Sequence, residues 1–287
     1  MNDVTIRFGS AGDVAFCAQL DVDEGWTDTP QDMRRLVLCE PRGFLIAEVC
    51  GRPVGQILSI SYGNMGWVGL LIVSSHYRGK GIGTVLMRRG IAYLQQSHVE
   101  TVYLEAIPHA ANFYRKLGFN DILRTWKFGR LNDDIPLTDA SKVERMQNID
   151  LTDVGELDKL YFLGNRLRVL EGIFRDNPNH CFVAKRRGGI KGYVMCRPTR
   201  LGFRIGPLIC DPSVHDIAES LLVAAMNSLP EKTMISLSAP EPNQICLDLL
   251  SRYQFERLTS NVRMFFGKRP DPSGTVGVFA LAGLEKG

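Results

Sequence analysis

Hydrophobic and polar positions along the first 130 residues alternate in runs that predict short strands and amphipathic helices. Val14, Cys17 and Leu20 recur at helical spacing, whereas other apolar runs have the length and composition of strands. In chain order the pattern predicts a strand at Val4–Phe8, helices at about 12–20 and 31–39, strands at Phe44–Val49, 54–61 and 68–73, a helix at 84–94, a strand at Thr101–Ala106, a helix at 110–117 and a strand at 119–128.

A basic, glycine-rich loop stands between the strand at 68–73 and the helix that follows it. Its sequence is Arg78-Gly79-Lys80-Gly81-Ile82-Gly83, followed by Thr84. Glycines allow a ligand to approach the backbone closely, and a helix start offers unpaired N–H groups with partial positive charge. This arrangement predicts a phosphate or pyrophosphate site.

Two common phosphate-binding motifs do not match this loop. It is not G-x-x-x-x-G-K-[ST], and Leu86 stands where G-x-G-x-x-G needs its third glycine. The string R-G-x-G-I-G after an apolar strand instead resembles the GNAT acetyltransferase superfamily, whose loop holds the pyrophosphate of acetyl-CoA. The order of predicted elements over residues 3–130 is also similar to that of a GNAT domain.

The second half of the chain repeats the first at an offset of 137 residues. Ala47 corresponds to Ala184, and the glycines at 51, 55 and 69 correspond to those at 188, 192 and 206. Such a match indicates duplication. We therefore expect an α+β (α/β) protein of two tandem GNAT folds, each a mixed, mostly antiparallel sheet flanked by helices. The expected parts are a catalytic domain at 1–132, a polar linker at 133–142 and a second domain at 143–287.

The second copy lacks the features that carry the resemblance to a cofactor site. Its loop reads His215-Asp216-Ile217-Ala218-Glu219-Ser220, without glycine. Further on the offset slips by one residue, so that Leu250 stands where the first copy has Tyr114. The prediction is a degenerate domain that keeps the fold and binds no cofactor. An extra strand is expected at 276–281.

Composition limits the other classes of function. The chain has 287 residues, a net charge of +3 and no apolar run long enough to cross a bilayer, so neither nucleic acid nor a membrane is expected as a partner. The seven cysteines never form C-x-x-C, which predicts no metal site and no disulfide framework. A cytoplasmic location is the expectation.

The resemblance assigns roles to residues of the first half. The backbone of Leu71, Ile72 and Val73 would pair with the cofactor arm and its thioester. Tyr114 lies in a string similar to the family's A-x-x-x-Y-x-x-x-G-F, in which the tyrosine is the usual general acid. Because a free tyrosine has a pKa of about 10 and a thiol about 8.5, we expect Tyr114 to donate a hydrogen bond to the leaving sulfur, and to act as a full acid only if its pKa is lowered. Many members also carry an asparagine seven residues before the tyrosine, where this chain has Ile107.

The general base has more than one candidate. Glu105 ends a predicted strand, and some family members carry a glutamate base there that acts through water. Strand alternation fits a cleft position for Glu105 but also a solvent position. His76, His109 and bulk water stay open for the same role.

The acceptor region is expected in the loop at 21–30. Asp23, Glu24 and Trp26 lie there, and carboxylates beside an aromatic ring suit a cationic amine, although a solvated acidic loop has the same composition. The resemblance implies an N-acetyltransferase that moves the acetyl group of acetyl-CoA to a small-molecule or peptide amine by direct transfer. A non-catalytic acetyl-CoA-binding module is the alternative, and a homodimer stays open.

Overall fold

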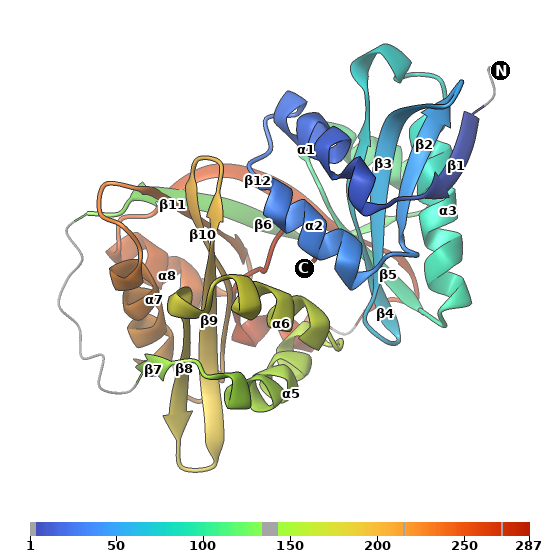
Figure 1. Cartoon of the computed structure of the whole chain (residues 1–287). Helices are drawn as coiled ribbons and strands as arrows, with labels where there is room; N and C mark the ends of the chain where they lie inside the picture. Colours follow the sequence, from blue (N-terminus) through green and yellow to red (C-terminus); the bar gives the residue numbers. More distant parts are fainter. Residues whose placement is uncertain (1–3, 134–142, 215, 271) are drawn as a thin grey trace.

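The computed structural model describes residues 4–133, 143–214, 216–270 and 272–287 (Figure 1). Nearly all of the predicted linker at 133–142 lies outside the described residues, and so does His215. None of the described helices combines the length and the apolar character that a membrane span requires.

The first half contains the elements that its hydrophobic pattern predicts, with ends that differ by a few residues. These are β1 (Val4–Phe8), α1 (Val14–Asp23), α2 (Pro30–Cys39), β2 (Phe44–Val49), β3 (Arg52–Ser61), β4 (Met65–Val73), α3 (Ile82–Gln96), β5 (Thr101–Ala106), α4 (Ala111–Lys116) and β6 (Asn120–Leu131).

Local chemistry explains the helix boundaries around the predicted acceptor loop. Thr29 Oγ1 accepts from the backbone N–H of Asp32 at 3.1 Å, and Pro30 occupies the first helical position of α2. The first helix continues into the segment expected to be loop and ends only at Asp23.

The second half repeats the same order of elements and adds one strand. It contains β7 (Val143–Arg145), α5 (Leu151–Phe162), α6 (Leu167–Asp176), β8 (Cys181–Arg186), β9 (Gly189–Thr199), β10 (Gly202–Cys210), α7 (Asp216–Ser228), β11 (Met234–Pro240), α8 (Gln244–Arg252), β12 (Glu256–Gly267) and β13 (Val278–Ala280). The added strand is shorter than the expected 276–281, because a 3₁₀ segment, Pro272–Gly277, precedes it.

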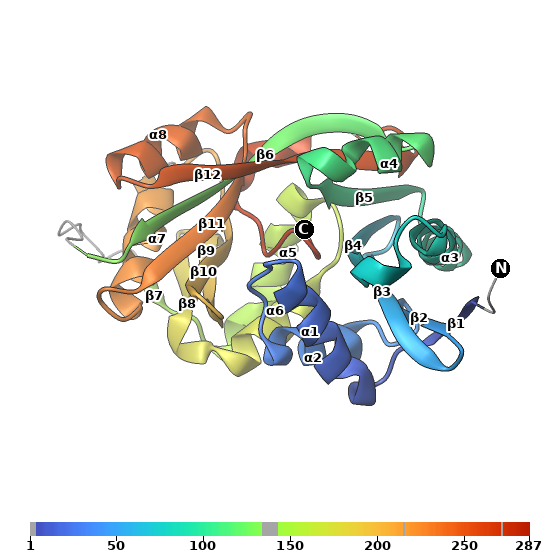
Figure 2. The same cartoon turned by 90° about the horizontal axis from the view of Figure 1, so that it is seen from above.

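All strands belong to one sheet that passes through both halves. Its order is β1-β2-β3-β4-β5-β12-β6-β11-β10-β9-β8-β7, with β13 on β10. Most pairs are antiparallel, but β4–β5 and β10–β11 are parallel. The last long strand of each half crosses into the other, because β12 lies between β5 and β6 while β6 pairs with β11. Figure 2 shows these two strands side by side across the molecule.

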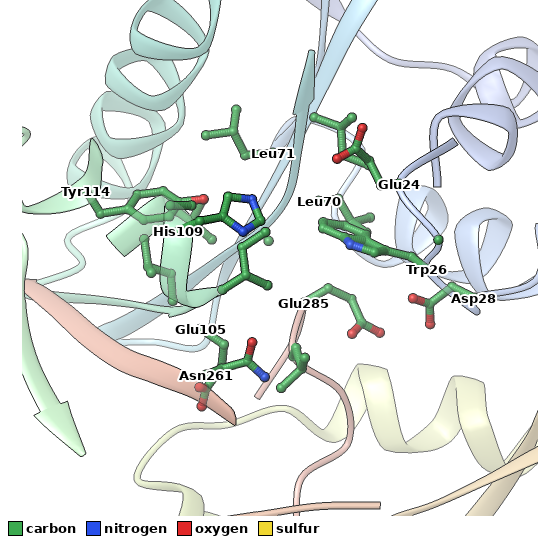
Figure 3. A pocket seen from close by; sticks show the side chains of 18 of the residues that line it. Glu24, Trp26, Asp28, Leu70, Leu71, Glu105, His109, Tyr114, Asn261 and Glu285 are labelled. Carbon is green, nitrogen blue, oxygen red and sulfur yellow. The ribbon is translucent and has the colours of Figure 1, made fainter. Parts of the chain in front are cut away.

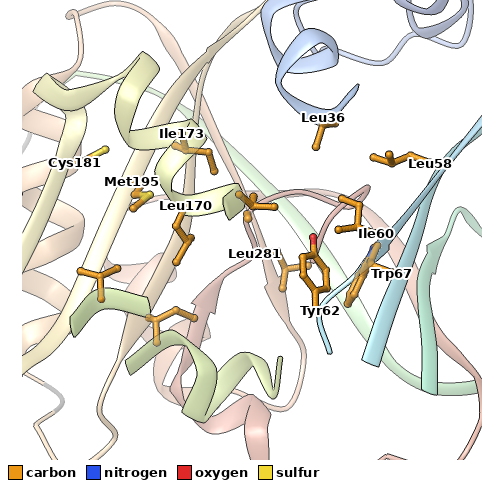
Figure 4. Packing of buried hydrophobic residues seen from close by; sticks show 14 of the residues in the cluster. Leu36, Leu58, Ile60, Tyr62, Trp67, Leu170, Ile173, Cys181, Met195 and Leu281 are labelled. Atoms are coloured by element: carbon orange, nitrogen blue, oxygen red, sulfur yellow. The ribbon is translucent and has the colours of Figure 1, made fainter. Parts of the chain in front are cut away.

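One apolar core joins the two halves. It brings Leu36 of α2 and Ile60 of β3 into one cluster with Leu170 and Ile173 of α6 (Figure 4). Two further clusters also draw on the crossing strands. One contains residues of α3 with Met264 of β12, and the other contains residues of α7 and α8 with Phe128 of β6. Burial of this joint core fixes the position of one half against the other.

Residues 281–287 run between the halves, where the C label stands in Figure 1. Trp67 Nε1 donates to the carbonyl of Leu284 at 2.9 Å, and Tyr62 Oη donates to that of Lys286 at 2.9 Å. Arg166 Nη1 donates to the carbonyl of Gly287 at 2.6 Å. These bonds hold the segment beside the cavity described next.

Candidate active site

The glycine-rich loop connects β4 to α3. Gly81 is the residue before the helix and has φ +79°, in the left-handed region where an L side chain is strained. The first N–H groups of the 15-residue helix therefore follow a turn without side-chain bulk. Arg78 borders the loop, where its Nε donates to the carbonyl of Val73 at 2.8 Å and its guanidinium pairs with Glu24.

A cavity of about 590 Å³ opens where β4 and β5 separate. Their parallel pairing runs from Met65↔Thr101 to Trp67↔Tyr103, and beyond it Leu70 adopts φ +52°. The segment from Leu70 to Val73 lines the cavity, as does Gly83 in the first turn of α3. The three predicted thioester-binding positions, Leu71, Ile72 and Val73, thus lie at one wall.

Tyr114 of α4 lines the same cavity. Its ring makes edge contacts with Phe113 and Phe119, with centroids 5.1 and 6.0 Å away. Burial raises its pKa to about 12, so the phenol stays protonated. In Figure 3 its hydroxyl points towards His109.

Glu105 lies on the sheet face beside the cavity, but its side chain is fully enclosed. Arg263 Nε on β12 donates to Glu105 Oε1 at 2.8 Å, and Thr125 Oγ1 donates to the same oxygen at 3.0 Å. Burial raises the pKa of this carboxyl, and the Arg263 charge opposes that rise. The solvent position left open by the sequence pattern is therefore excluded.

The predicted acceptor residues separate into two groups. Trp26 and Glu24 line the cavity (Figure 3). Asp23 does not line it, since its carboxylate accepts from Gln19 on the exposed side of α1 at 2.8 Å. Of the two histidines considered, His109 lines the cavity and His76 does not.

Several cavity residues come from segments that the sequence analysis did not associate with the site. They are Lys127 of β6, Arg204 of β10, Thr259 and Asn261 of β12, and Leu284 and Glu285 near the chain end. Asn261 is 3% exposed, and no hydrogen bond to its side chain is found within the described ranges.

The corresponding groove of the second half is filled by the chain itself. Strand β13 pairs with β10 through Leu208↔Ala280 and Ile209↔Val278, and the N–H of Leu281 donates to Ser238 of β11 at 2.8 Å. The chain passes so close that a Cβ at Gly206 would lie 2.0 Å from the carbonyl oxygen of Leu281. The space that lies open between β4 and β5 is thus occupied between β10 and β11.

Comparison with known proteins identifies both halves. Residues 15–119 match the acetyltransferase (GNAT) family, and residues 154–279 match an acetyltransferase (GNAT) domain. Holothin acyltransferase of Pseudoalteromonas sp. (strain SANK 73390) is 25% identical over 268 residues, which are 93% of this chain and 88% of that protein.

Solved structures share the fold over nearly the whole chain. A putative acetyltransferase from Pyrococcus horikoshii superposes with a TM-score of 0.84 at 24% identity, covering 99% of this chain and 96% of the other. A tandem GNAT protein from the clavulanic acid biosynthesis pathway gives 0.66 at 15% identity, over 94% and 100% of the two chains. The expected fold class is confirmed, and the chain is an acyltransferase that belongs to the GNAT acetyltransferases, with two such domains in tandem.

Proposed function

We propose that this protein transfers the acetyl group of acetyl-CoA to a primary amine, directly in a ternary complex, in the cavity of the first half. The observation that carries the proposal is one continuous site, in which the glycine loop at the start of α3 meets the separated strands β4 and β5 beside Tyr114. GNAT enzymes use acetyl-CoA as co-substrate. The residues present fit it, because the turn at Gly81 leaves open space within 4 Å of where a Cβ would stand.

The cofactor would be held by the predicted loop and strand. The backbone N–H groups after Gly81, together with the cations of Arg78 and Lys80, suit a pyrophosphate. The parallel pairs between β4 and β5 stop at Trp67↔Tyr103, so the β4 backbone from Leu71 to Val73 faces the opening and can pair with an amide-rich arm. The remaining predicted positions, Gly79, Ile82, Gly83 and Thr84, surround this helix start.

Acetyl-CoA supplies an activated thioester. In the proposed reaction the amine nitrogen bonds to the acetyl carbon as the carbon–sulfur bond breaks, one proton leaves the nitrogen and one reaches the sulfur. Tyr114 donates a hydrogen bond to that sulfur, because its pKa of about 12 keeps it a phenol. Glu105 is the proposed base. Its side chain is enclosed, so its proton would travel by way of water in the cavity.

The first test is release of free CoA over a panel of amines. Steady CoA release that depends on an amine supports the transferase. Tight acetyl-CoA binding in calorimetry, without turnover of any amine, would instead support a non-catalytic acetyl-CoA-binding module. Gly81→Val serves as the negative control, because this variant should lose both acetyl-CoA binding and turnover.

A further inference from the structure

The cavity wall remote from the cofactor loop follows one face of the central strands. Register places Glu105 opposite Arg263, Thr259 opposite Lys127, and Ser236 opposite Arg204. Neighbouring strands lie about 4.8 Å apart, so Lys127 on β6 starts roughly 10 Å from β5, and Arg204 starts two strands beyond it. Two cationic side chains thus line the cavity on the side away from β5.

The carboxylates that line the cavity already have cationic partners. Glu24 pairs with Arg78, and Glu105 pairs with Arg263 at 2.8 Å. Glu285 pairs with Lys286, with Arg197 at 3.4 Å and, more loosely, with Arg204 at 3.7 Å. Asp28 lies 3.9 Å from Arg197.

Lys127 is the exception among these charges. Its ammonium has neither an ion pair nor a hydrogen bond within the part of the chain that the structure describes, although the residue lines the cavity. Burial and the neighbouring Arg204 charge lower its pKa, and Asp28 opposes this. A bound anion would relieve the repulsion between the two cations.

Asn261 adds a neutral group to the same place. It stands two residues before Arg263 on β12, opposite Thr125 of β6, so its side chain shares the face of Arg263 and Glu105. Figure 3 shows its amide between Glu105 and Glu285. Its amide makes no hydrogen bond within the described ranges, yet its atoms are not among the fully enclosed unpaired ones, so the amide faces the cavity and can bond to a ligand group.

We propose that the acceptor is an amine that also carries an anionic group, and that this anion binds Lys127 and Arg204 while Asn261 hydrogen-bonds the part between anion and amine. The inference rests on the proposed transferase function and names its substrate class. It differs from the cationic acceptor that the acidic loop predicted, because Asp23 of that loop lies outside the cavity, whereas Lys127 lines the cavity without an ion pair among the described residues.

The test compares matched amines. L-amino acids are assayed against their carboxamides, and phosphoethanolamine against ethanolamine, with CoA release as the readout. In at least one pair, the anionic amine should have a kcat/KM about ten- to hundredfold higher than its neutral counterpart. This is the gain expected from one hydrogen bond to a charged group. Comparison of the two pairs shows whether the site prefers a carboxylate or a phosphate.

Variants assign the preference to the predicted residues. Lys127→Gln should remove the preference through a higher KM, with kcat nearly unchanged and the neutral amine unaffected, whereas Lys127→Arg should keep it. Arg124→Gln is the matched control, because Arg124 lies exposed on the same strand and outside the cavity lining. Asn261→Ala should raise KM for both members of a pair.

Equal or better turnover of the neutral amines would overturn the inference and leave the transferase intact. If no amine is acetylated, the proposed function fails instead. Calorimetry with CoA and N-acetyl amino acids against their N-acetyl carboxamides then still decides the anion site, since equal affinities would refute it.

Discussion

The raised pKa of Tyr114 limits what its hydroxyl can do for a leaving thiolate. With a pKa of about 12, complete proton transfer to a thiolate of pKa about 8.5 would be uphill by roughly 5 kcal/mol. Hydrogen-bond donation to developing negative charge has no such cost, because the proton stays on oxygen. The phenol therefore stays protonated, and able to donate, at every pH at which the enzyme would be assayed.

Tyr114→Phe should keep the affinity for acetyl-CoA and lower kcat by about 10- to 1,000-fold, the range for one lost transition-state donor. Calorimetry and CoA release measure the two quantities. Tyr93→Phe is the control, because its hydroxyl bonds to Glu40 at 2.6 Å outside the cavity. A turnover within twofold of the wild type would make Tyr114 a packing residue.

Glu105→Gln tests the base. A carboxyl with a raised pKa is ionised only above that pKa, so activity due to a Glu105 base falls as pH drops through it. The variant should be slower and should lose this acidic limb. It should also cost about 3–5 kcal/mol of stability by leaving Arg263 unpaired, which a melting curve measures. Lower stability with an unchanged pH profile would leave Glu105 only an ion-pair partner.

Asp21 makes stability depend on pH. Burial and the charge of Asp28 raise its pKa from 3.8 to about 8, so between these values the folded chain binds a proton that the unfolded chain releases. Its contribution to stability is complete below pH 4 and is lost by about pH 8. Relative to Asp21→Asn, the wild type should lose about 1.4 kcal/mol per pH unit in denaturant titrations between pH 5 and 7.5.

The loop before α3 depends on backbone shape as much as on charge. Gly81 holds φ +79° and nothing lies within 4 Å of its missing Cβ, so a side chain there meets no protein atom but distorts the turn and fills space at the helix start. A side chain introduced at Gly81 should therefore weaken the binding of a ligand at this helix N-terminus more than it disturbs protein packing.

Gly81→Val should abolish acetyl-CoA binding in calorimetry. Gly51→Val is the matched control, since Gly51 has φ +72° and the same open surroundings in the β2–β3 turn. Both variants carry similar backbone strain, and only the first should lose the ligand. Equal acetyl-CoA affinities in the two variants would remove the loop from the binding site.

Sequence patterns located the elements of the first half because strand, helix and turn signals are local. They placed Asp23 near the acceptor because the helix was expected to end earlier; continuation to Asp23 turns it towards Gln19, four residues before it. The partner of Glu105 stands 158 residues away, and Lys127, Arg204 and Asn261 reach the cavity only through strand register. No local pattern encodes such pairings.

Strands β6 and β12 exchange places between the halves, so each half contributes one strand beside the groove of the other. Because β12 separates β5 from β6, the cavity of the first half includes Thr259 and Asn261 of the second. Residues 143–287 would lack the β6 neighbour of both β11 and β12 if expressed alone. Tests of the second half therefore belong in the full chain, and the boundary at 133–142 stays a prediction.

In the second half the sequence places Asp216 and Glu219 where a pyrophosphate would bind, but their negative charges are not the main obstacle to cofactor binding. Asp216 pairs with Arg186 at 3.2 Å and Glu219 with Arg252 at 3.3 Å, so both carboxylates that would face a pyrophosphate are partly neutralised. The stronger obstacle is β13. It pairs with β10, which is the counterpart of β4, and so occupies the strand edge that stays free on β4 in the first half. A ligand would have to displace this strand and its buried side chains, Val278 and Phe279 among them.

The full chain should therefore bind one equivalent of acetyl-CoA. Calorimetric titration of the wild type should saturate at a ratio of one, and Gly81→Val should give none, because the second groove offers no replacement site. The Gly51→Val protein should again bind one equivalent. A ratio of two in the wild type, or a remaining equivalent in Gly81→Val, would mean that β13 yields to the ligand and that the second half is a cofactor site.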